Sequence, residues 1–167
     1  FFSRNKLLKL KNAVLKEKYE KIEKDLFSLS HTKDLVSSQN SVIKEFYNFL
    51  SSKEFVSLME KLTSQKLSLK IDMQSHRMKQ GDYLLFHDDV VEGRIIAYIV
   101  YLTSLNSSDG GALRLYNIKK PLKPIKKIIP TFSTFACFKV SQKSLHDVEE
   151  IKSNKKRLTI GGWFYGN

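Results

Sequence analysis

The sequence predicts an α+β domain in which N-terminal helices pack on one face of a double-sheet β-sandwich or jelly roll. Before about residue 66, apolar residues recur with a helical period of about 3.6 residues. After that point they alternate within short segments that turn residues separate. No helical stretch separates these segments, which disfavours an interleaved α/β fold. We expect one domain of 167 residues, with 1–65 as its helical part and 66–167 as its β core.

Three helices are expected in the first part. Their apolar stripes lie within residues 7–19, 42–50 and 55–62. Ser38 or Ser41 would cap the second helix, and Ser51 or Ser52 the third, because a serine hydroxyl accepts hydrogen bonds from the first backbone N–H groups of a helix.

The β core is expected to contain eight strands. They are predicted over residues 67–72, 82–88, 94–102, 112–116, 125–129, 133–139, 143–147 and 156–164. The turn residues of 106–111 separate two of these strands, and Pro130-Thr131 separates two others.

Composition excludes several classes of protein. No run approaches the roughly 18 consecutive apolar residues of a membrane span, so no membrane association is expected. The single cysteine, Cys137, excludes a disulfide framework and a Cys-rich zinc module, and it favours a reduced intracellular setting.

The charge is strongly basic, with 29 Lys+Arg against 17 Asp+Glu and a formal net charge of +12. The densest basic block contains Lys119, Lys120, Lys123, Lys126 and Lys127. Two interpretations stay open for this block. It is either a solvated loop or a contact for an anionic partner such as a ribonucleoprotein, since lysines attract phosphate without distinguishing sequence.

Two of the four histidines belong to a candidate metal site. His87 ends an apolar segment and Asp89 follows it by two residues, so the alternation of a strand predicts that both side chains point the same way. His146, in or beside a later strand, can supply a second imidazole. Two histidines and one carboxylate are typical of non-haem Fe(II) oxygenases, although a His-x-Asp pair also arises often by chance. His31 and His76 have no partner motif and are expected to be structural or exposed.

A second candidate group lies on the predicted strand 156–164. By alternation, Arg157 and Thr159 share one face with Trp163. An inward arginine is costly unless it meets an anion, and a guanidinium with a nearby hydroxyl suits a carboxylate. A dicarboxylate co-substrate could bind iron with one end and these two residues with the other. The alternative is an exposed arginine at the start of a strand, with Trp163 in the core.

Six segments of the β core form an ordered set. They are His87–Arg94 (HDDVVEGR), Ala97–Leu102 (AYIVYL), Asp109–Tyr116 (DGGALRLY), Phe138–Ser141 (FKVS), His146–Glu150 (HDVEE) and Arg157–Gly166 (RLTIGGWFYG). In this order they resemble the 2-oxoglutarate- and Fe(II)-dependent ribosomal prolyl 3-hydroxylases. The N-terminal part resembles that family more loosely, and the ordered set is specific where each motif alone is not.

The resemblance implies a double-stranded β-helix fold, which is a cupin-like jelly roll. It implies that His87, Asp89 and His146 bind Fe(II) and that Arg157 binds the remote carboxylate of 2-oxoglutarate. Where the family has a tyrosine nine residues before its first ligand histidine, this chain has Met78. Tyr83, expected on the inward side of its strand, is the candidate to replace the missing hydroxyl as a co-substrate contact.

The resemblance also implies a reaction and a setting. O₂ and 2-oxoglutarate would be consumed, with ascorbate as a candidate reductant, to hydroxylate one proline of a small-subunit ribosomal protein at ring carbon 3. Cytoplasm, nucleus or both are the expected locations. Because the sequence ends at Asn167, we expect the catalytic domain without the second, non-catalytic barrel of the family.

Two alternative functions stay open from the sequence. One is a basic ribonucleoprotein-binding module on the same fold that has lost catalysis, an interpretation that Met78 keeps open. The other is a competent oxygenase that acts on a different protein or on a nucleic-acid base.

Overall fold

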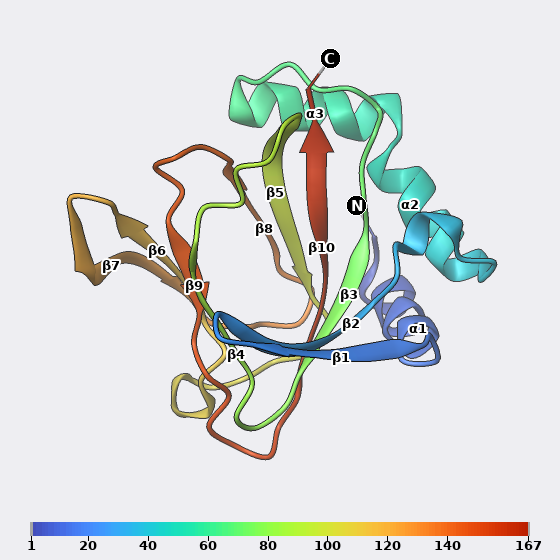
Figure 1. Cartoon of the computed structure of the whole chain (residues 1–167). Helices are drawn as coiled ribbons and strands as arrows, with labels where there is room; N and C mark the ends of the chain where they lie inside the picture. The colour runs from blue at the N-terminus through green and yellow to red at the C-terminus, as the bar shows by residue number, and fades with distance from the viewer. Residues whose placement is uncertain (1, 167) are drawn as a thin grey trace.

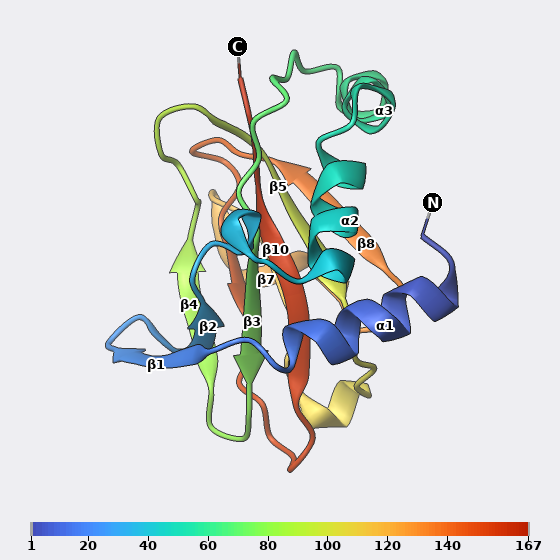
Figure 2. The same cartoon turned by 90° about the vertical axis from the view of Figure 1, so that its right-hand side faces the viewer.

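The computed structural model describes residues 2–166. Within this range, three α-helices lie on one side of a curled β-sheet: α1 (Arg4–Val14), α2 (Ser41–Leu50) and α3 (Lys53–Thr63). Figure 2 shows the three helices gathered over the region of β3, β10 and β5. No helix in the described part is long and apolar enough to cross a membrane.

Each helix begins at a side chain that accepts backbone hydrogen bonds. Ser3 caps α1, Asn40 caps α2 and Ser52 caps α3. The prediction for α3 is therefore confirmed. The prediction of Ser38 or Ser41 for α2 is wrong, because the Asn40 carboxamide oxygen accepts from the backbone N–H groups of both Val42 and Ile43.

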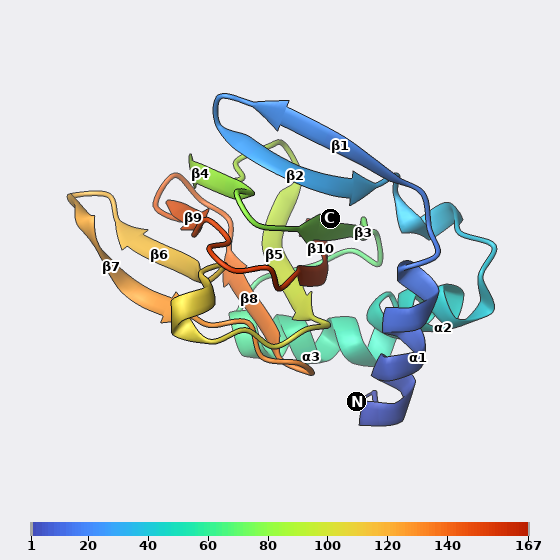
Figure 3. The same ribbon diagram turned by 90° about the horizontal axis from the view of Figure 1, so that it is seen from below.

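Ten strands of the described chain form one antiparallel sheet. Their bounds are β1 (Tyr19–Lys24), β2 (Phe27–Thr32), β3 (Gln74–Met78), β4 (Tyr83–His87), β5 (Arg94–Tyr101), β6 (Leu113–Asn117), β7 (Lys120–Ile128), β8 (Phe135–Lys139), β9 (His146–Val148) and β10 (Arg157–Tyr165). The order across the sheet is β7-β6-β9-β4-β2-β3-β10-β5-β8, and β1 is added to β2. Figure 3 shows the sheet curling so that β4 and β9 lie opposite β5 and β10.

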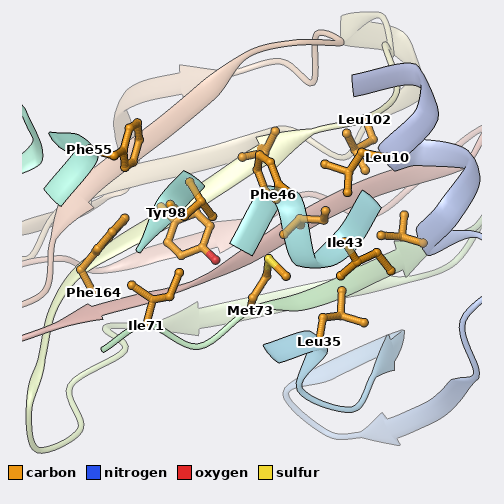
Figure 4. Close-up of a cluster of buried hydrophobic side chains, with 14 of the residues drawn as sticks. Leu10, Leu35, Ile43, Phe46, Phe55, Ile71, Met73, Tyr98, Leu102 and Phe164 are labelled. Carbon is orange, nitrogen blue, oxygen red and sulfur yellow. The ribbon is translucent and has the colours of Figure 1, made fainter. Parts of the chain in front are cut away.

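The main hydrophobic core lies between the helices and one face of the sheet. The helices contribute Leu10, Ile43 and Phe46, each at most 2% exposed. Strand β10 contributes Ile160 and Phe164, both fully buried, and Figure 4 shows Phe164 in this cluster beside Tyr98. Apolar burial on this scale is the dominant favourable term in folding, so this face stabilises the domain.

A smaller apolar cluster lies inside the curl of the sheet. Its buried members are Leu29, Met78, Leu105, Leu113, Val148 and Ile151. They come from β2, β3, β6, β9 and the connecting loops, and several of them line the interior cavity described below. Polar side chains in that cavity therefore lie against an apolar wall.

Two predicted segments differ from the structure. Residues 19–32, expected as part of a helical region, form the β1–β2 hairpin. The Lys/Glu-rich sequence of β1 has a favourable helix propensity. Pairing with β2 outweighs this weak preference. Residues 67–72, expected as a strand, make one isolated bridge between Ile71 and Phe164, and the strand lies instead at Gln74–Met78.

Two other strands are displaced from their expected bounds. The late strand expected at 143–147 is β9, His146–Val148, because residues 141–144 form a hydrogen-bonded turn. The strand expected at 125–129 is the longer β7, so the lysines of 119–127 lie on a β-hairpin rather than on a loop. Figure 1 shows this β6–β7 hairpin projecting from the side of the domain opposite α1 and α2.

Candidate active site

Three side chains from different segments meet in the interior of the curled sheet. His87 ends β4 and His146 begins β9, and the register of these strands pairs the two residues directly. Their imidazole centroids are 4.0 Å apart. Asp89 lies in the loop after β4, and one ligand atom from each of the three residues lies within 4.8 Å of the other two. The convergence that the sequence predicted is therefore present.

Asp89 reaches this point by a route that strand alternation did not predict. Strand β4 ends at His87, and Asp89 has a left-handed backbone with φ of 63°. Aspartate tolerates this conformation better than most residues, and such departures cluster at functional sites. The turn is held from both sides, because the Asp88 carboxylate accepts the Val90 N–H at 3.0 Å and the Asp88 carbonyl accepts the Ser144 hydroxyl at 2.8 Å.

Backbone carbonyls fix the orientation of both imidazoles. Nδ1 of His87 lies 2.8 Å from the Leu85 carbonyl oxygen, and Nδ1 of His146 lies 2.7 Å from that of Ser144. A carbonyl can only accept, so each Nδ1 carries the hydrogen and each neutral ring presents the lone pair of Nε2. The two Nε2 atoms lie 3.4 and 3.5 Å from the Asp89 carboxylate oxygens.

The electrostatics of this triad favour a bound cation. Burial acts to raise the pKa of Asp89, but the His87 contact and the charge of His146 outweigh it and hold the pKa below its ordinary value. Burial lowers the pKa of His87, but Asp89 more than offsets this and raises it; burial and the nearby His87 lower the pKa of His146. An ionised carboxylate and two Nε2 lone pairs that face one another fit a divalent metal ion of the kind that takes two histidines and one carboxylate.

An ion-pair network holds β9 from behind the triad. The Arg114 guanidinium of β6 donates to both carboxylate oxygens of Asp147, with Nε 2.8 Å from Oδ1. The Tyr116 hydroxyl donates to the same carboxylate at 3.2 Å. Asp147 is 3% exposed and directly follows His146, so these bonds fix the strand that presents the second imidazole.

At the other end of the cavity, Arg157 is buried without an anion. It is 3% exposed, and its guanidinium donates to the Met78 sulfur at 3.6 Å and to the Thr159 hydroxyl at 3.4 Å, with the Tyr101 ring beside it. Within residues 2–166 its Nε has no partner and no carboxylate forms a salt bridge with it. Burial lowers its pKa, but a guanidinium stays charged. A buried cation with this surrounding fits an anionic ligand.

The structure places most of the predicted residues in one cavity. Arg157, Thr159, Trp163 and the three residues of the triad all line it, and Met78 lies opposite Arg157 in the β3–β10 register. Their roles as ligands stay predictions. Tyr83 does not line the cavity: a bulge between Leu84 and His87 shifts the register of β4 against β9, so Leu84 and not Tyr83 shares the inward side with His87.

One cavity residue, and one residue that packs beside the Arg157 guanidinium, were not identified as site residues from the sequence. His76, expected to be structural or exposed, lines the cavity from β3. The strand that carries it was predicted at 67–72, so its inward position was missed. Tyr101 of β5 faces the Arg157 guanidinium, with its ring centroid 5.3 Å from Cζ, and its buried hydroxyl has no hydrogen-bond partner in the described chain. Its pairing with Thr159 would have identified it if the β5–β10 register had been known.

A cationic stack lies beside Trp163. The Arg94 guanidinium carbon is 3.4 Å from the ring centroid of Trp163, at cation–π distance. Within the described residues, the buried donors Arg94 Nε and Trp163 Nε1 form no hydrogen bond of normal geometry, although Trp163 lies close enough to Asp89 to help lower the pKa of that carboxyl. Unpaired buried donors are costly, so this pair has hydrogen-bonding capacity left for a ligand.

Comparison with known proteins identifies the family. The sequence model described as the 2OG-Fe(II) oxygenase superfamily matches residues 73–165, which contain the triad and Arg157. The chain belongs to this superfamily. The oxygenase superfamily to which the motifs pointed is thereby confirmed.

Named relatives agree with this assignment. The chain is 33% identical over 165 residues to a prolyl 3-hydroxylase, OGFOD1, of Xenopus laevis, an alignment that covers 96% of this chain and 32% of the relative. It is 32% identical over 167 residues to the prolyl 3-hydroxylase sudestada1 of Drosophila melanogaster, covering 92% and 31% of the two chains. This superfamily member thus spans about a third of the length of the curated relatives it matches.

Solved structures confirm the fold. A prolyl 4-hydroxylase of Pseudomonas putida has a TM-score of 0.82 at 14% identity, covering 100% of this chain and 89% of that one. A viral collagen prolyl hydroxylase from Paramecium bursaria Chlorella virus-1 has a TM-score of 0.70 at 19% identity, covering 99% and 92%. The curled sheet with its helices is the predicted double-stranded β-helix.

Proposed function

We propose that this superfamily member is an Fe(II)- and 2-oxoglutarate-dependent oxygenase that hydroxylates a prolyl residue of a small-subunit ribosomal protein. The single observation that carries the proposal is the presence, in one cavity, of the His87–Asp89–His146 triad and a buried arginine without an anion. The first group suits the metal and the second suits a carboxylate, and a 2-oxo dicarboxylate has a chelating end and a remote carboxylate.

The residues of the triad would hold the metal through His87 Nε2, His146 Nε2 and a carboxylate oxygen of Asp89. Bound Fe(II) would supply the oxidative step, in which 2-oxoglutarate and O₂ yield succinate and CO₂, and the second oxygen atom becomes the hydroxyl of the substrate. The protein keeps the two imidazoles in the ligating tautomer through the Leu85 and Ser144 carbonyls.

Arg157 and Thr159 would bind the remote carboxylate of the co-substrate. Hydrogen bonds from a guanidinium to a carboxylate are charge-assisted and therefore among the stronger ones. The Thr159 hydroxyl would donate a further hydrogen bond to the same carboxylate. The apolar wall formed by Leu113, Val148 and their neighbours would exclude water from the rest of the co-substrate. The Tyr101 ring lies beside the Arg157 guanidinium.

The stacked pair Arg94–Trp163 is suited to a peptide substrate. A peptide presents carbonyl oxygens that accept from Arg94 Nε and Trp163 Nε1, and a pyrrolidine ring packs on an aromatic face. A prolyl target is further supported by the relatives, which are named as prolyl 3-hydroxylases. The ribosomal protein as target rests on the sequence motifs alone.

A ribonucleoprotein contact through the β6–β7 hairpin is the second part of the proposal. Lys127 pairs with Glu149 at 2.8 Å, whereas Lys119, Lys120, Lys123 and Lys126 form no salt bridge within residues 2–166. In the register, Lys126 opposes Leu115 and Leu115 opposes His146, so Lys126 lies on the cavity side of the hairpin. The lysines of the β6–β7 hairpin would then contact RNA phosphates of the ribonucleoprotein close to the protein segment that enters the cavity. Ascorbate as reductant and location in cytoplasm, nucleus or both remain predictions.

The first test is metal-dependent turnover. Purified protein with Fe(II) and 2-oxoglutarate should release succinate, and intact-mass analysis of incubated small-subunit ribosomal proteins should show a gain of one oxygen atom on a prolyl residue. Absence of succinate release in the wild type would support the non-catalytic binding module. Succinate release with no ribosomal protein modified would support an oxygenase that acts on another protein or on nucleic acid.

A second test separates catalysis from docking. The variant in which Lys123 and Lys126 are both replaced by Ala should bind ribosomal particles less tightly, with a weaker salt dependence, while its turnover on a short prolyl peptide equals that of wild type. A variant at Lys9 and Lys11 of α1, on the opposite side of the domain, is the matched charge control. Equal binding by the two variants would refute the hairpin as the docking arm.

A further inference from the structure

Among the described residues, His76 is a polar side chain of the cavity that belongs neither to the metal triad, nor to the Arg157–Thr159 group, nor to the Arg94–Trp163 pair. It belongs to β3, and the antiparallel register places it directly opposite Thr159 of β10. The Met78–Arg157 pair lies two residues further along the two strands, on the same face. Opposed residues of an antiparallel pair share a face of the sheet. His76 therefore points into the cavity at the level of the Thr159 hydroxyl.

The imidazole of His76 has hydrogen-bonding capacity that the described chain does not use. Neither ring nitrogen has a hydrogen-bond partner within residues 2–166, in contrast to the rings of His87 and His146. Burial, the charge of Arg157 and that of His31 lower its pKa to about 4. The ring is therefore neutral at physiological pH and offers one N–H donor and one acceptor.

The neighbours of His76 on the cavity wall are mostly glycine and apolar residues. Gly161 faces the ring, and a Cβ added there would lie 4.0 Å from His76 Nδ1 and 3.0 Å from the Tyr98 carbonyl oxygen. Most of the remaining wall is apolar, formed by residues such as Leu29, Ile99 and Leu113. On β3, the position opposite Arg157 is the thioether of Met78, which is a weak acceptor and no donor. Of the two β3 residues that line the cavity, His76 is thus the one with a hydrogen-bond donor.

The Arg157 guanidinium extends to the level of His76. Its Nη1 lies 3.4 Å from the Thr159 hydroxyl, and Thr159 and His76 oppose each other across β10 and β3. A carboxylate bound by Arg157 and Thr159 would therefore lie beside the imidazole. We propose that His76 is a co-substrate-binding residue whose ring N–H donates a hydrogen bond to the remote carboxylate of the 2-oxo dicarboxylate. This inference rests on the proposed function and completes its carboxylate clamp as Arg157, Thr159 and His76.

The test measures binding directly, on Zn(II)-loaded protein that does not turn over. Calorimetry should show that His76→Leu binds 2-oxoglutarate about tenfold more weakly than wild type, the factor expected for losing one hydrogen bond to a charged group. His76→Gln, which keeps a donor, should recover most of this loss. His31→Leu is the matched control, because His31 opposes His76 on β2 but does not line the cavity; it should bind like wild type.

Three further measurements identify the contact. A ring-nitrogen NMR signal of His76 should shift when 2-oxoglutarate is added, and the apparent KM for 2-oxoglutarate should rise in His76→Leu by the factor seen in binding. 2-Oxovalerate, which lacks the remote carboxylate, should bind wild type and His76→Leu equally. A similar loss for both ligands would place the contact at the 2-oxo acid end and overturn the proposal.

The outcomes also separate this inference from the proposed function. If wild type binds Zn(II) and 2-oxoglutarate and His76→Leu binds both equally well, the role of His76 is refuted while the oxygenase assignment stands. If wild type itself binds no 2-oxoglutarate in the presence of metal, the proposed function fails and the role of His76 fails with it. Metal affinity measured for each variant shows whether its fold is intact.

Discussion

The two faces of strand β10 carry out different tasks with residues that alternate in the chain. One face presents Ile160 and Phe164 to the helices, where both are fully buried in the main core. The other presents Arg157, Thr159 and Trp163 to the cavity, with a guanidinium that has no anionic partner in the described chain. One strand can therefore supply core residues on one face and cavity residues on the other, because neighbouring side chains point in opposite directions.

The largest effect is expected at the triad. Asp89→Ala removes the only charged residue of the triad and should weaken Mn(II) or Fe(II) binding by more than about a hundredfold. Even mutation of a residue that only hydrogen-bonds to a metal ligand can lower metal affinity by up to about a hundredfold. Turnover should be lost with it. Titration calorimetry with Mn(II) measures the first effect and succinate release the second. Asp88→Asn, which keeps the acceptor for the Val90 N–H, is the control and should bind metal normally.

A substitution on the helix-facing side should show the opposite pattern. Ile160→Ala should lower the free energy of unfolding by about 2–5 kcal/mol, and Ile160→Val by about 0.5–1.5 kcal/mol, because both leave a cavity in the main core. Urea unfolding checks these values. Metal affinity of the folded variant should equal that of wild type. A change in metal affinity as large as that in Asp89→Ala would contradict the separation of the two faces.

Arg157→Gln, three residues away on the cavity side, should affect binding rather than folding. Its affinity for 2-oxoglutarate should fall by about 1.5–3 kcal/mol, the range for hydrogen bonds to charged groups. The free energy of unfolding without co-substrate should not fall, because the variant removes a buried charge that lacks an anionic partner. Calorimetry and urea unfolding on the same sample decide between these outcomes. A strongly destabilised variant would show that the guanidinium is part of the core.

The cavity side should also make stability depend on pH. The folded pKa of His76 is about 4, below the ordinary 6.5, so the unfolded chain takes up a proton that the folded protein excludes. The free energy of unfolding therefore has its full value, as far as His76 is concerned, above pH 6.5. It falls as the pH drops from 6.5 toward 4. Urea unfolding of metal-free protein at several pH values should show this decline, and His76→Gln should flatten it. An unchanged slope in that variant would refute the assignment.

The smallest effect is expected at Tyr101. Tyr101→Phe removes a buried hydroxyl without a partner, so the co-substrate-free protein should unfold with a free energy equal to or about 1 kcal/mol above that of wild type. Affinity for 2-oxoglutarate should fall slightly if the hydroxyl contacts it. Loss of stability in this variant would mean that the hydroxyl is hydrogen-bonded in the free protein.

The degree to which the sequence predicted the site depends on how local each signal was. His87 and Asp89 were found because two ligand-type residues at short spacing are visible without coordinates, and His146 was found because it belongs to the same ordered set of motifs. The inward side of Arg157 and Thr159 followed from alternation along an undisturbed strand. The same alternation failed for Tyr83, because a bulge that depends on the partner strand β9 shifted the parity.

Residue types and periods along the chain were enough to indicate the oxygenase superfamily, the fold class, the apolar faces of the helices and the three candidate ligands. The folded chain was needed to show that β1 and β2 are strands, that His76 lines the cavity, that Tyr101 packs beside Arg157 and that Arg157 lacks an anion. These features depend on which strands pair and in which register. Pairing is a choice between distant segments, and no local period of the sequence encodes it.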